Sequence, residues 1–526
     1  MYIASEICCG AEWRFSSALP RKILVIPLAH IRKIITIVAE LQRIRCSCNA
    51  RRERRNKQMS FRILWILFAL ICLAFPGSVQ NAELGVVVNT EQAYAGYTFV
   101  APQINSLAYV IDNEGRVIRQ WDFGSRTREV HLLENGNLLV VRSARDIMDY
   151  TLMPRGFPPD GGFAEFTWDG ELISEFAFTD AERHHHHGVD ILPNGNIIAV
   201  VRQYYHIDEA IAMGLNPAIV AEHFDGIEYF LPDTIVEIDL AQGEVLWIWN
   251  PMDHLIQALD PALPNYGAVS EHPQRIDINY QSYYLKGITS TQSAGAGNWM
   301  HANMVNYNPM LDQVVMSVRS FDEFWVIDHS ETTEEASGPA GDLLYRWGNP
   351  FAHGAGSLSE DRQLFQQHDV QWIDQGLPGA GNFLIFNNRN NLTREDETGS
   401  DEYSSIIELS PHVRADGRYD WTGEPEIVWQ YAEDFFSPFI SGVQRLPNGN
   451  TLITEGRSGR LIEVSAAGEV VWEFINPMTS EGFAGADDEV ERGLGINNAI
   501  FRARKYSPDH PGLVGKDLRP GKFIGE

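Results

Sequence analysis

A β-hairpin that recurs five times is the feature of this sequence that most constrains its fold. Each copy opens on a valine, alternates apolar and polar residues, turns, and returns as a second strand that ends at an arginine. Asn-Gly turns in three copies supply the positive φ angles that a two-residue hairpin turn requires. The copies span residues 130–142, 189–202, 305–319, 370–389 and 443–457. Such internal repetition predicts a repeat architecture.

Second hairpins follow the first ones at residues 234–251, 324–350 and 461–477, so each repeat holds about four strands. Four antiparallel strands repeated around an axis form a β-propeller. Five blades are visible directly, and residues 97–123 together with a strand at 500–503 assemble a sixth from the two ends. We therefore predict an all-β fold: a six-bladed β-propeller of four-stranded antiparallel blades, its ring closed by N- and C-terminal strands without a free edge.

The segment before residue 83 differs from the rest of the chain. Residues 1–58 are a basic N-terminal extension, and a start codon misplaced upstream of Met59 is the interpretation we favour for it. Residues 59–82 hold an apolar run behind a short basic start, which is typical of a signal peptide or an uncleaved anchor. The run is shorter than the ~20 residues of a membrane span. We therefore expect a periplasmic or secreted protein.

The propeller is expected to occupy residues 83–526, with a long insertion at 251–297 that covers a binding face or is mobile. All five cysteines lie before residue 83, so this part has no disulfide, thiolate metal site or cysteine nucleophile. Residues 1–82 hold 13 Lys and Arg against 4 Asp and Glu, which leaves a net charge of −38 on residues 83–526. Such a surface repels nucleic acid and anionic lipid, and we predict neither as a partner.

Polar side chains precede the anchoring valine of each hairpin. The residue two places earlier is Arg128, His187, Asn303, His368 or Ser441, and the residue four places earlier is Arg126, His185, His301, Gln366 or Phe439. Strand parity places all of them on one face. The hairpins return to the same level at Arg142, Arg202, Arg319, Arg389 and Arg457. The pattern predicts a cluster of histidine and arginine at one channel mouth, which suits a small oxyanion.

Structural roles compete with this interpretation. Most strand-ending arginines are expected to be solvated or paired with carboxylates, and a single propeller histidine is more often a hydrogen-bonding residue than a catalyst. The run His184–His187 could bind a metal, but neighbours on a strand point to opposite faces, so we predict no metal site. Phe436 and Trp299 are candidates for an apolar wall around an aryl group, with a core role as the alternative for both.

Several motifs resemble those of the bacterial aryl-sulfate sulfotransferase family over roughly residues 95–515. They are Trp299-Met300-His301-x-Asn303, Ser317-Val318-Arg319, Gln367-His368-Asp369-Val370-Gln371, the histidines before Asn194-Gly195-Asn196, and the tail Ala499-Ile500-Phe501-Arg502-Ala503-Arg504. The family implies a six-bladed propeller that moves a sulfuryl group from a phenolic sulfate ester to a phenol. It uses no nucleotide sulfate donor, and we expect no cofactor.

The resemblance implies roles for four residues. His368 matches the histidine that becomes transiently sulfated, while His187, His301 and Arg319 match groups that bind the sulfuryl oxygens. We also predict that Asn303 and Arg389 contribute to substrate binding. The chain departs from the family in having Gly188 after His187, where an aspartate is common, and in the lack of an N-terminal β-sandwich domain.

A neutral imidazole is a competent nucleophile near neutral pH, and the charge of a transferring sulfuryl group is spread over three oxygens, as in phosphoryl transfer. The expected partners are therefore small aryl sulfates and phenols. An aryl-sulfate hydrolase at the same site and a non-catalytic ligand-binding propeller are the alternatives. A quinone-dependent dehydrogenase would need a tryptophan-docking pattern and a calcium site, which we do not find in the sequence.

Overall fold

The computed structural model describes residues 84–143, 161–178, 182–224, 226–282, 297–391, 402–479, 482–483 and 498–524. The predictions for residues 1–58 and 59–82, and part of the predicted insertion (283–296), lie outside these ranges. Within them, no helix has the length and apolar character to cross a bilayer.

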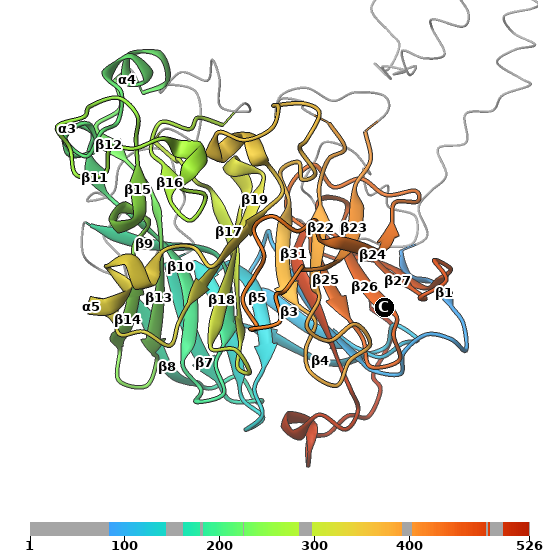
Figure 1. Ribbon diagram of the computed structural model, residues 1–526. Coiled ribbons are helices and arrows are strands. Elements are labelled where there is room, and N and C mark those ends of the chain that lie inside the picture. The colour runs from blue at the N-terminus through green and yellow to red at the C-terminus, as the bar shows by residue number, and fades with distance from the viewer. Residues whose placement is uncertain are drawn as a thin grey trace, which may run out of the picture. The chain divides into compact units, whose positions relative to one another are not determined.

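Six small antiparallel sheets form the blades of a β-propeller, as the repeats predicted (Figure 1). Blade 1 comprises β5 (Thr127–Leu132), β6 (Leu138–Ser143), β7 (Gly161–Phe166) and β8 (Leu172–Ala177). Blade 2 comprises β9 (Arg183–Ile191), β10 (Ile197–Gln203), β13 (Asp233–Asp239) and β14 (Glu244–Trp249). Blade 3 comprises β17 (Ala302–Asn308), β18 (Gln313–Val318), β19 (Glu323–Asp328) and β20 (Tyr345–Trp347).

The remaining blades include both ends of the described chain. Blade 4 comprises β21 (His368–Trp372), β22 (Phe383–Asn387), β23 (Ser405–Ser410) and β24 (Glu426–Tyr431). Blade 5 comprises β25 (Gly442–Arg445), β26 (Thr451–Glu455), β27 (Arg460–Val464) and β28 (Val470–Ile475), with β1 (Gly85–Asn89) as a fifth strand. Blade 6 comprises β31 (Ile500–Tyr506), β2 (Tyr97–Pro102), β3 (Leu107–Ile111) and β4 (Val117–Asp122).

Blade 6 has the composition predicted for it, because its innermost strand β31 comes from the C-terminal part of the chain and its other strands from the N-terminal part. β31 contacts the inner strand β5 of blade 1 and the inner strand β25 of blade 5.

Apolar residues between neighbouring blades form the core. Leu139, Val141 and Phe163 of blade 1, for example, pack against Val189 and Val236 of blade 2. The anchoring valines are all buried, and three of them, Val189, Val370 and Val443, pack in clusters that span two neighbouring blades. Burial of apolar surface stabilises the fold by about 25 cal/mol per Å². The apolar residues on the facing sides of the strands therefore stabilise the contact between one blade and the next.

An insertion between β10 and β13 contains helices that the repeat pattern did not predict. It holds β11 (Tyr205–His206), α3 (Ile207–Ala212), α4 (Pro217–His223) and β12 (Tyr229–Phe230), which lie together at one end of the molecule (Figure 1). Asn216 caps α4 by accepting a hydrogen bond from the Ala218 N–H at 2.9 Å.

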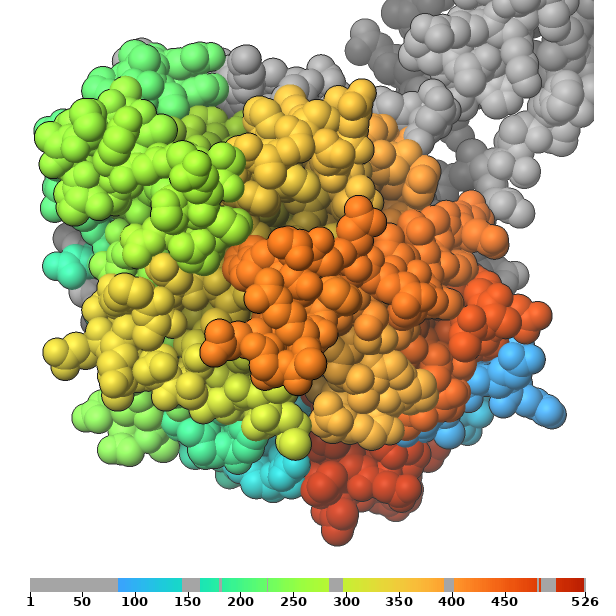
Figure 2. Space-filling model, in the orientation of Figure 1, coloured from blue at the N-terminus to red at the C-terminus, as the bar shows by residue number. Residues whose placement is uncertain are grey.

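The predicted insertion after blade 2 is well packed where the structure describes it. It includes η2 (Pro251–His254), β15 (Leu255–Ile256), η3 (Val269–Glu271) and β16 (Ile276–Asp277). Figure 2 shows this segment, in light green, beside the yellow segment that holds α5 (Thr333–Ala336), η6 (Pro339–Gly341) and η7 (Pro350–His353). The Leu343 N–H donates to the Gln274 carbonyl at 3.0 Å, and Arg346 Nη1 donates to the Arg275 carbonyl at 3.0 Å.

Candidate active site

Three histidines from three different blades meet where their inner strands begin. The rings of His187 and His301 lie 5.0 Å apart, centroid to centroid. Gln366 links Arg319 to His368, because its side chain accepts from Arg319 Nη2 and its carbonyl oxygen lies 3.1 Å from His368 Nδ1. Burial and then the charge of Arg319 lower the pKa of both His301 and His368. The structure therefore brings together the four residues that the sequence singled out for catalysis: His187, His301, His368 and Arg319.

Irregular backbone, not strand parity, makes this meeting possible. His187, His301 and Gln366 have φ angles of 65°, 49° and 56°, in the left-handed region that residues other than glycine rarely adopt. The inner strands β5, β9, β17, β21 and β31 each contain a register shift. A bulge re-aims the side chains that precede it, so a parity argument fails across it.

The prediction that all the residues two and four places before the valines share one face is therefore wrong. His185 lies in the blade interface, with its ring 4.4 Å from that of Phe163. Asn303, a predicted substrate ligand, is buried, and its amide donates to the Gln367 carbonyl at 2.7 Å. Gln366 instead accepts a hydrogen bond from Arg319 Nη2, which orients that guanidinium.

Two acceptors fix the tautomer of His368. Its Nδ1 lies 2.8 Å from Asn388 Oδ1 and 3.1 Å from the Gln366 carbonyl oxygen. Asn388 cannot turn its amide nitrogen toward the histidine, because that nitrogen donates to the Ser437 carbonyl at 2.7 Å. Nδ1 of His368 therefore carries the hydrogen, and Nε2 keeps its lone pair. The sequence gave no reason to single out Asn388.

His301 has the opposite tautomer. The Asn298 side chain accepts the His301 backbone N–H at 3.2 Å through Oδ1, so its amide nitrogen is directed at His301 Nδ1, at 2.8 Å. Nδ1 of His301 is therefore the acceptor, and Nε2 carries the hydrogen. One histidine of the site thus offers a lone pair and its neighbour a donor.

Burial keeps the histidines of the site neutral. It lowers the pKa of His368 to about 3, with Arg319 as the second cause. Burial also lowers the pKa of His187 and of His301 well below the ordinary value, with help from His301 in the first case and from Arg319 in the second. A neutral imidazole is the form that can attack an electrophile.

Cations surround these neutral rings although the protein as a whole is strongly acidic. Arg128, from β5, lies over the Phe501 ring at 4.5 Å, and its charge lowers the pKa of His187. Arg389, another predicted ligand, is buried in an ion pair with Glu402, and its guanidinium lies 5.7 Å from the Phe436 ring. Positive charge near the histidines thus comes from Arg319, Arg202 and Arg128, each of which adds to the effect of burial in lowering the pKa of His301.

Aromatic side chains border the site on the blade 5 side. Phe439 is half-buried beneath the Arg457 guanidinium, and Phe436 is half-buried beneath Arg389. Trp299 has the other role that the sequence allowed. It is buried in the core, where its Nε1 donates to the Tyr280 carbonyl at 3.0 Å and its ring lies 5.4 Å from that of Phe321. The insertion residue Tyr280 thereby supports the segments that carry His301 and Arg319.

A buried ion network lies in the channel behind the histidines. Arg502 of β31 donates to Glu129 at 2.6 Å and lies 3.0 Å from Asp369. Burial alone would raise the pKa of Glu129, but Arg502 and His131 outweigh it and hold that pKa at about 2. The network joins blade 6 to blades 1 and 4, and its side chains are almost fully inaccessible to solvent.

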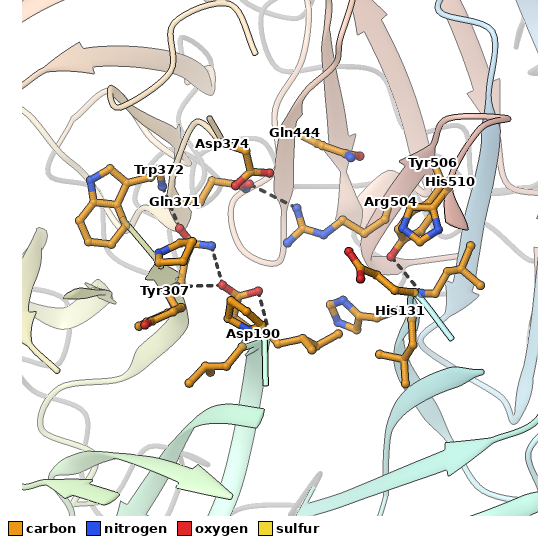
Figure 3. A pocket seen from close by; sticks show the side chains of 18 of the residues that line it. His131, Asp190, Tyr307, Gln371, Trp372, Asp374, Gln444, Arg504, Tyr506 and His510 are labelled. Carbon is orange, nitrogen blue, oxygen red and sulfur yellow. Dashed lines mark hydrogen bonds between the residues drawn. The ribbon is translucent and has the colours of Figure 1, made fainter. Parts of the chain in front are cut away.

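A cavity of about 770 Å³ occupies the opposite mouth of the channel (Figure 3). Its wall includes Asp190, Asp374 and Arg504, whose side chains converge in Figure 3. Most of its polar groups tie blades together. Asp190, for example, accepts from Asn306 at 2.7 Å and from the Tyr307 N–H at 2.8 Å. Although this cavity is large and its wall also contains histidines and arginines, we place the chemistry at the histidine mouth, where His368 has its Nε2 lone pair in a neutral ring beside Arg319.

Hydrogen bonds within the protein engage the neighbouring histidines. His184 lies 3.2 Å from Arg202 and also contacts the Tyr204 hydroxyl, and His186 lies 2.9 Å from Asp233. In the part of the chain that the structure describes, no group of three or more His, Cys, Asp or Glu side chains is placed to hold a metal ion.

The fold and this site define a six-bladed propeller with a histidine-centred, cationic site at one channel mouth. The family model described as Arylsulfotransferase (ASST) matches residues 86–480, and the chain belongs to that family. No curated protein is detectably similar to the chain.

Matches among solved structures include a Bacteroides caccae protein of unknown function, at 14% identity and a TM-score of 0.38, covering 72% of this chain and 93% of that one. Virginiamycin B lyase from Staphylococcus aureus is 9% identical with a TM-score of 0.33, covering 77% and 87%. A periplasmic gluconolactonase from Pseudomonas aeruginosa is 12% identical with a TM-score of 0.31, covering 81% and 99%.

Proposed function

We propose that this protein is an aryl-sulfate sulfotransferase that moves a sulfuryl group from a phenolic sulfate ester to a phenol through a sulfated His368. The observation that carries the proposal is the tautomer of His368. Its Nδ1–H is held by Asn388 and the Gln366 carbonyl, so the free lone pair is on Nε2, in a ring kept neutral by burial beside Arg319.

In the first half-reaction, Nε2 of His368 attacks the sulfur of the donor. The N–S bond forms, the ester S–O bond breaks, and a phenolate leaves. Arg319 offers two parallel N–H donors to the sulfuryl oxygens, and His301 adds its Nε2–H. Preorganised donors of this kind stabilise a transition state whose charge is spread over several oxygens.

In the second half-reaction, the oxygen of an acceptor phenol attacks the same sulfur, and the N–S bond breaks. The net charge of the protein is unfavourable for anions. The arginines of the site oppose this effect locally and lower the energy of the bound anionic donor. The half-buried rings of Phe436 and Phe439 offer an apolar border to the aryl group.

The test is to incubate the full-length protein with p-nitrophenyl sulfate and search by mass spectrometry for a sulfated histidine in the peptide that contains His368. We expect a His368→Asn variant to fold and to lose both the modification and the release of p-nitrophenol. His329→Asn is the matched control, since His329 bridges Asp312 and Glu237 on the outer part of blades 2 and 3. Turnover by the His368 variant would refute the proposal.

An added phenol separates transfer from hydrolysis. Labelled sulfate recovered on the phenol supports transferase activity, whereas label recovered only as inorganic sulfate identifies a hydrolase at the same site. From the apolar run within residues 59–82 we further propose that the protein acts in the periplasm or outside the cell, which fractionation of the native host would test.

A further inference from the structure

A buried carboxylate lies behind His187 and is connected to it through a second histidine. Asp233, the first residue of β13, places Oδ1 2.9 Å from Nε2 of His186. Nδ1 of His186 in turn contacts Nδ1 of His187, and the two rings are nearly perpendicular with centroids 4.8 Å apart. The chain of contacts runs from the protein interior to the partly exposed ring of His187.

The order of hydrogen bonds along this chain depends on the charge of its inner end, and the following order holds for the form in which Asp233 is a carboxylate. A carboxylate accepts, so Nε2 of His186 carries a hydrogen and Nδ1 of that neutral ring has the lone pair. Nδ1 of His187 must then donate to it, which leaves Nε2 of His187 with a lone pair. His187 therefore differs from His301, whose Nδ1 receives a hydrogen bond from Asn298 and whose Nε2 is a donor.

We propose that Asp233, His186 and His187 form a proton relay, in which Nε2 of His187 acts as general acid toward the departing phenolate and as general base toward the incoming phenol. The inference rests on the proposed sulfotransferase function and adds to it the source and the destination of the proton. His187 is the catalytic residue, and His186 and Asp233 act through it.

The protons balance over one catalytic cycle. Before donor cleavage the relay holds one more proton than in the carboxylate form: Asp233 is the carboxylic acid and donates to Nε2 of His186, Nδ1 of His186 donates to Nδ1 of His187, and Nε2 of His187 carries a hydrogen. When the donor S–O bond breaks, that Nε2–H protonates the phenolate, the hydrogen on Nδ1 of His186 moves to Nδ1 of His187, and the carboxylic acid hydrogen of Asp233 moves to Nε2 of His186, which produces the carboxylate form. When the acceptor phenol attacks the sulfated His368, each hydrogen moves back in the opposite direction. The phenol supplies the hydrogen that the first phenolate removed, so no other acid or base is required.

The surroundings favour storing that proton on the carboxyl group. Burial raises the pKa of Asp233 to about 6, against the lowering effects of Arg202 and of the Ala302 N–H, which donates to Oδ2 at 2.6 Å. Burial and then Arg202 lower the pKa of His186, to which His184, His185 and His187 also contribute. His187 faces His301, Arg128, His368 and Arg202, all of which oppose a positive charge on its ring.

Asp233 also has a structural task, because its Oδ2 holds the start of β17 at Ala302. A test must separate the two roles. Asp190 provides the matched control: it too lies on blade 2 and accepts hydrogen bonds from β17, at Tyr307 and Asn306, but at the opposite mouth of the channel. Asp233→Asn and Asp190→Asn each remove one carboxylate that links the same two blades.

The readout is the dependence on the leaving group. A general acid matters most when the departing phenolate is strongly basic, so single-turnover release is compared for phenyl sulfate and p-nitrophenyl sulfate. We expect Asp233→Asn to slow release from phenyl sulfate by about 100-fold and from p-nitrophenyl sulfate by less than about 5-fold, within the range of general acid catalysis. Asp190→Asn should change both by less than about 3-fold.

Each outcome has a meaning. If Asp233→Asn slows release from both donors equally, Asp233 only holds the site together and the relay is overturned. If the variant slows release from neither donor, the relay is overturned as well. Sulfated His368 must still form in Asp233→Asn with p-nitrophenyl sulfate. If the wild-type protein itself forms none, it is the proposed function that fails.

A measurement on the wild-type protein covers the case in which Asp233→Asn does not fold. The relay predicts a solvent deuterium isotope effect of about 2 on phenol release from phenyl sulfate and one near unity for p-nitrophenyl sulfate. Equal effects for the two donors overturn it.

Discussion

Asn388 offers the sharpest test of the proposed role of His368 as the nucleophile. Its Oδ1 accepts from His368 Nδ1 at 2.8 Å, and its amide nitrogen donates to the Ser437 carbonyl at 2.7 Å and to Ser441 at 3.1 Å. Asn388→Ala removes an acceptor that selects the tautomer with a free Nε2. The preference for this tautomer of His368 is not lost completely, because the Gln366 carbonyl oxygen remains 3.1 Å from Nδ1.

The expected effect of Asn388→Ala on the sulfation rate follows from the fact that Nδ1 of His368 has two acceptors. A buried hydrogen bond contributes about 1 kcal/mol net, so the loss of one of two acceptors should slow sulfation of His368 by about 5- to 10-fold rather than by orders of magnitude. The Ser437 carbonyl loses its amide donor, which should lower the free energy of unfolding by about 1–3 kcal/mol.

The assay is the single-turnover burst of p-nitrophenol, normalised to the folded fraction. Asn450→Ala is the matched control, since the buried Asn450 amide donates to Gln92 and Glu463 at the opposite end of blade 5. It should lose similar stability at an unchanged burst rate. An unchanged burst rate in Asn388→Ala would refute the tautomer argument, and a loss of 1,000-fold or more (about 4 kcal/mol) would refute its magnitude.

Three further predictions concern charge. Arg319→Lys replaces a two-pronged donor by a point charge and should lower kcat/KM for p-nitrophenyl sulfate by about 100-fold, whereas Arg142→Lys, on the partly exposed pair with Glu175, should leave it unchanged. The pKa of His368 is about 3 in the folded protein and ~6.5 in an unfolded chain, so between these pH values the unfolded state binds one more proton than the folded state. The contribution of His368 to the free energy of unfolding is therefore complete above pH ~6.5 and falls by up to about 1.4 kcal/mol per pH unit below it. The dependence of the free energy of unfolding on pH, measured by denaturation, should be shallower in His368→Asn. Arg502→Met leaves the buried Glu129 and Asp369 without their closest cation and should cost about 3–5 kcal/mol in urea denaturation. Arg119→Met, on the exposed pair with Asp169, should cost much less, and equal costs would contradict the burial argument.

The blades were predictable because their determinants are local. A strand alternates with a period of two, and an Asn-Gly pair specifies a tight turn, so hairpins such as 189–202 and 443–457 can be read directly. The composition of blade 6 followed from counting strands at the two ends of the chain. The helices α3 and α4 fall between two strands of one blade, where the repeat offers no template.

The gathering of the candidate side chains at one mouth was predictable, but their detailed geometry was not. Histidines and an arginine at repeated positions indicated which side chains gather, since a propeller directs equivalent positions to one mouth. The tautomers depend on partners such as Asn388 and Asp233, which lie far away in sequence from His368 and His187 and have no distinctive spacing. The positive φ angles of His187 and His301 could not be read from the sequence either, because residues other than glycine adopt them only rarely.

The ion network of Arg502, Glu129 and Asp369 has a consequence for kinetics. These side chains are almost fully inaccessible to solvent and lie on the inner strands. For the proposed transfer we therefore expect donor and acceptor to enter by the same mouth, and the phenol released from the donor to leave by it before an acceptor enters. The steady-state pattern is therefore expected to be ping-pong, with parallel double-reciprocal lines. Excess acceptor should inhibit competitively with respect to the donor by occupying the unsulfated enzyme.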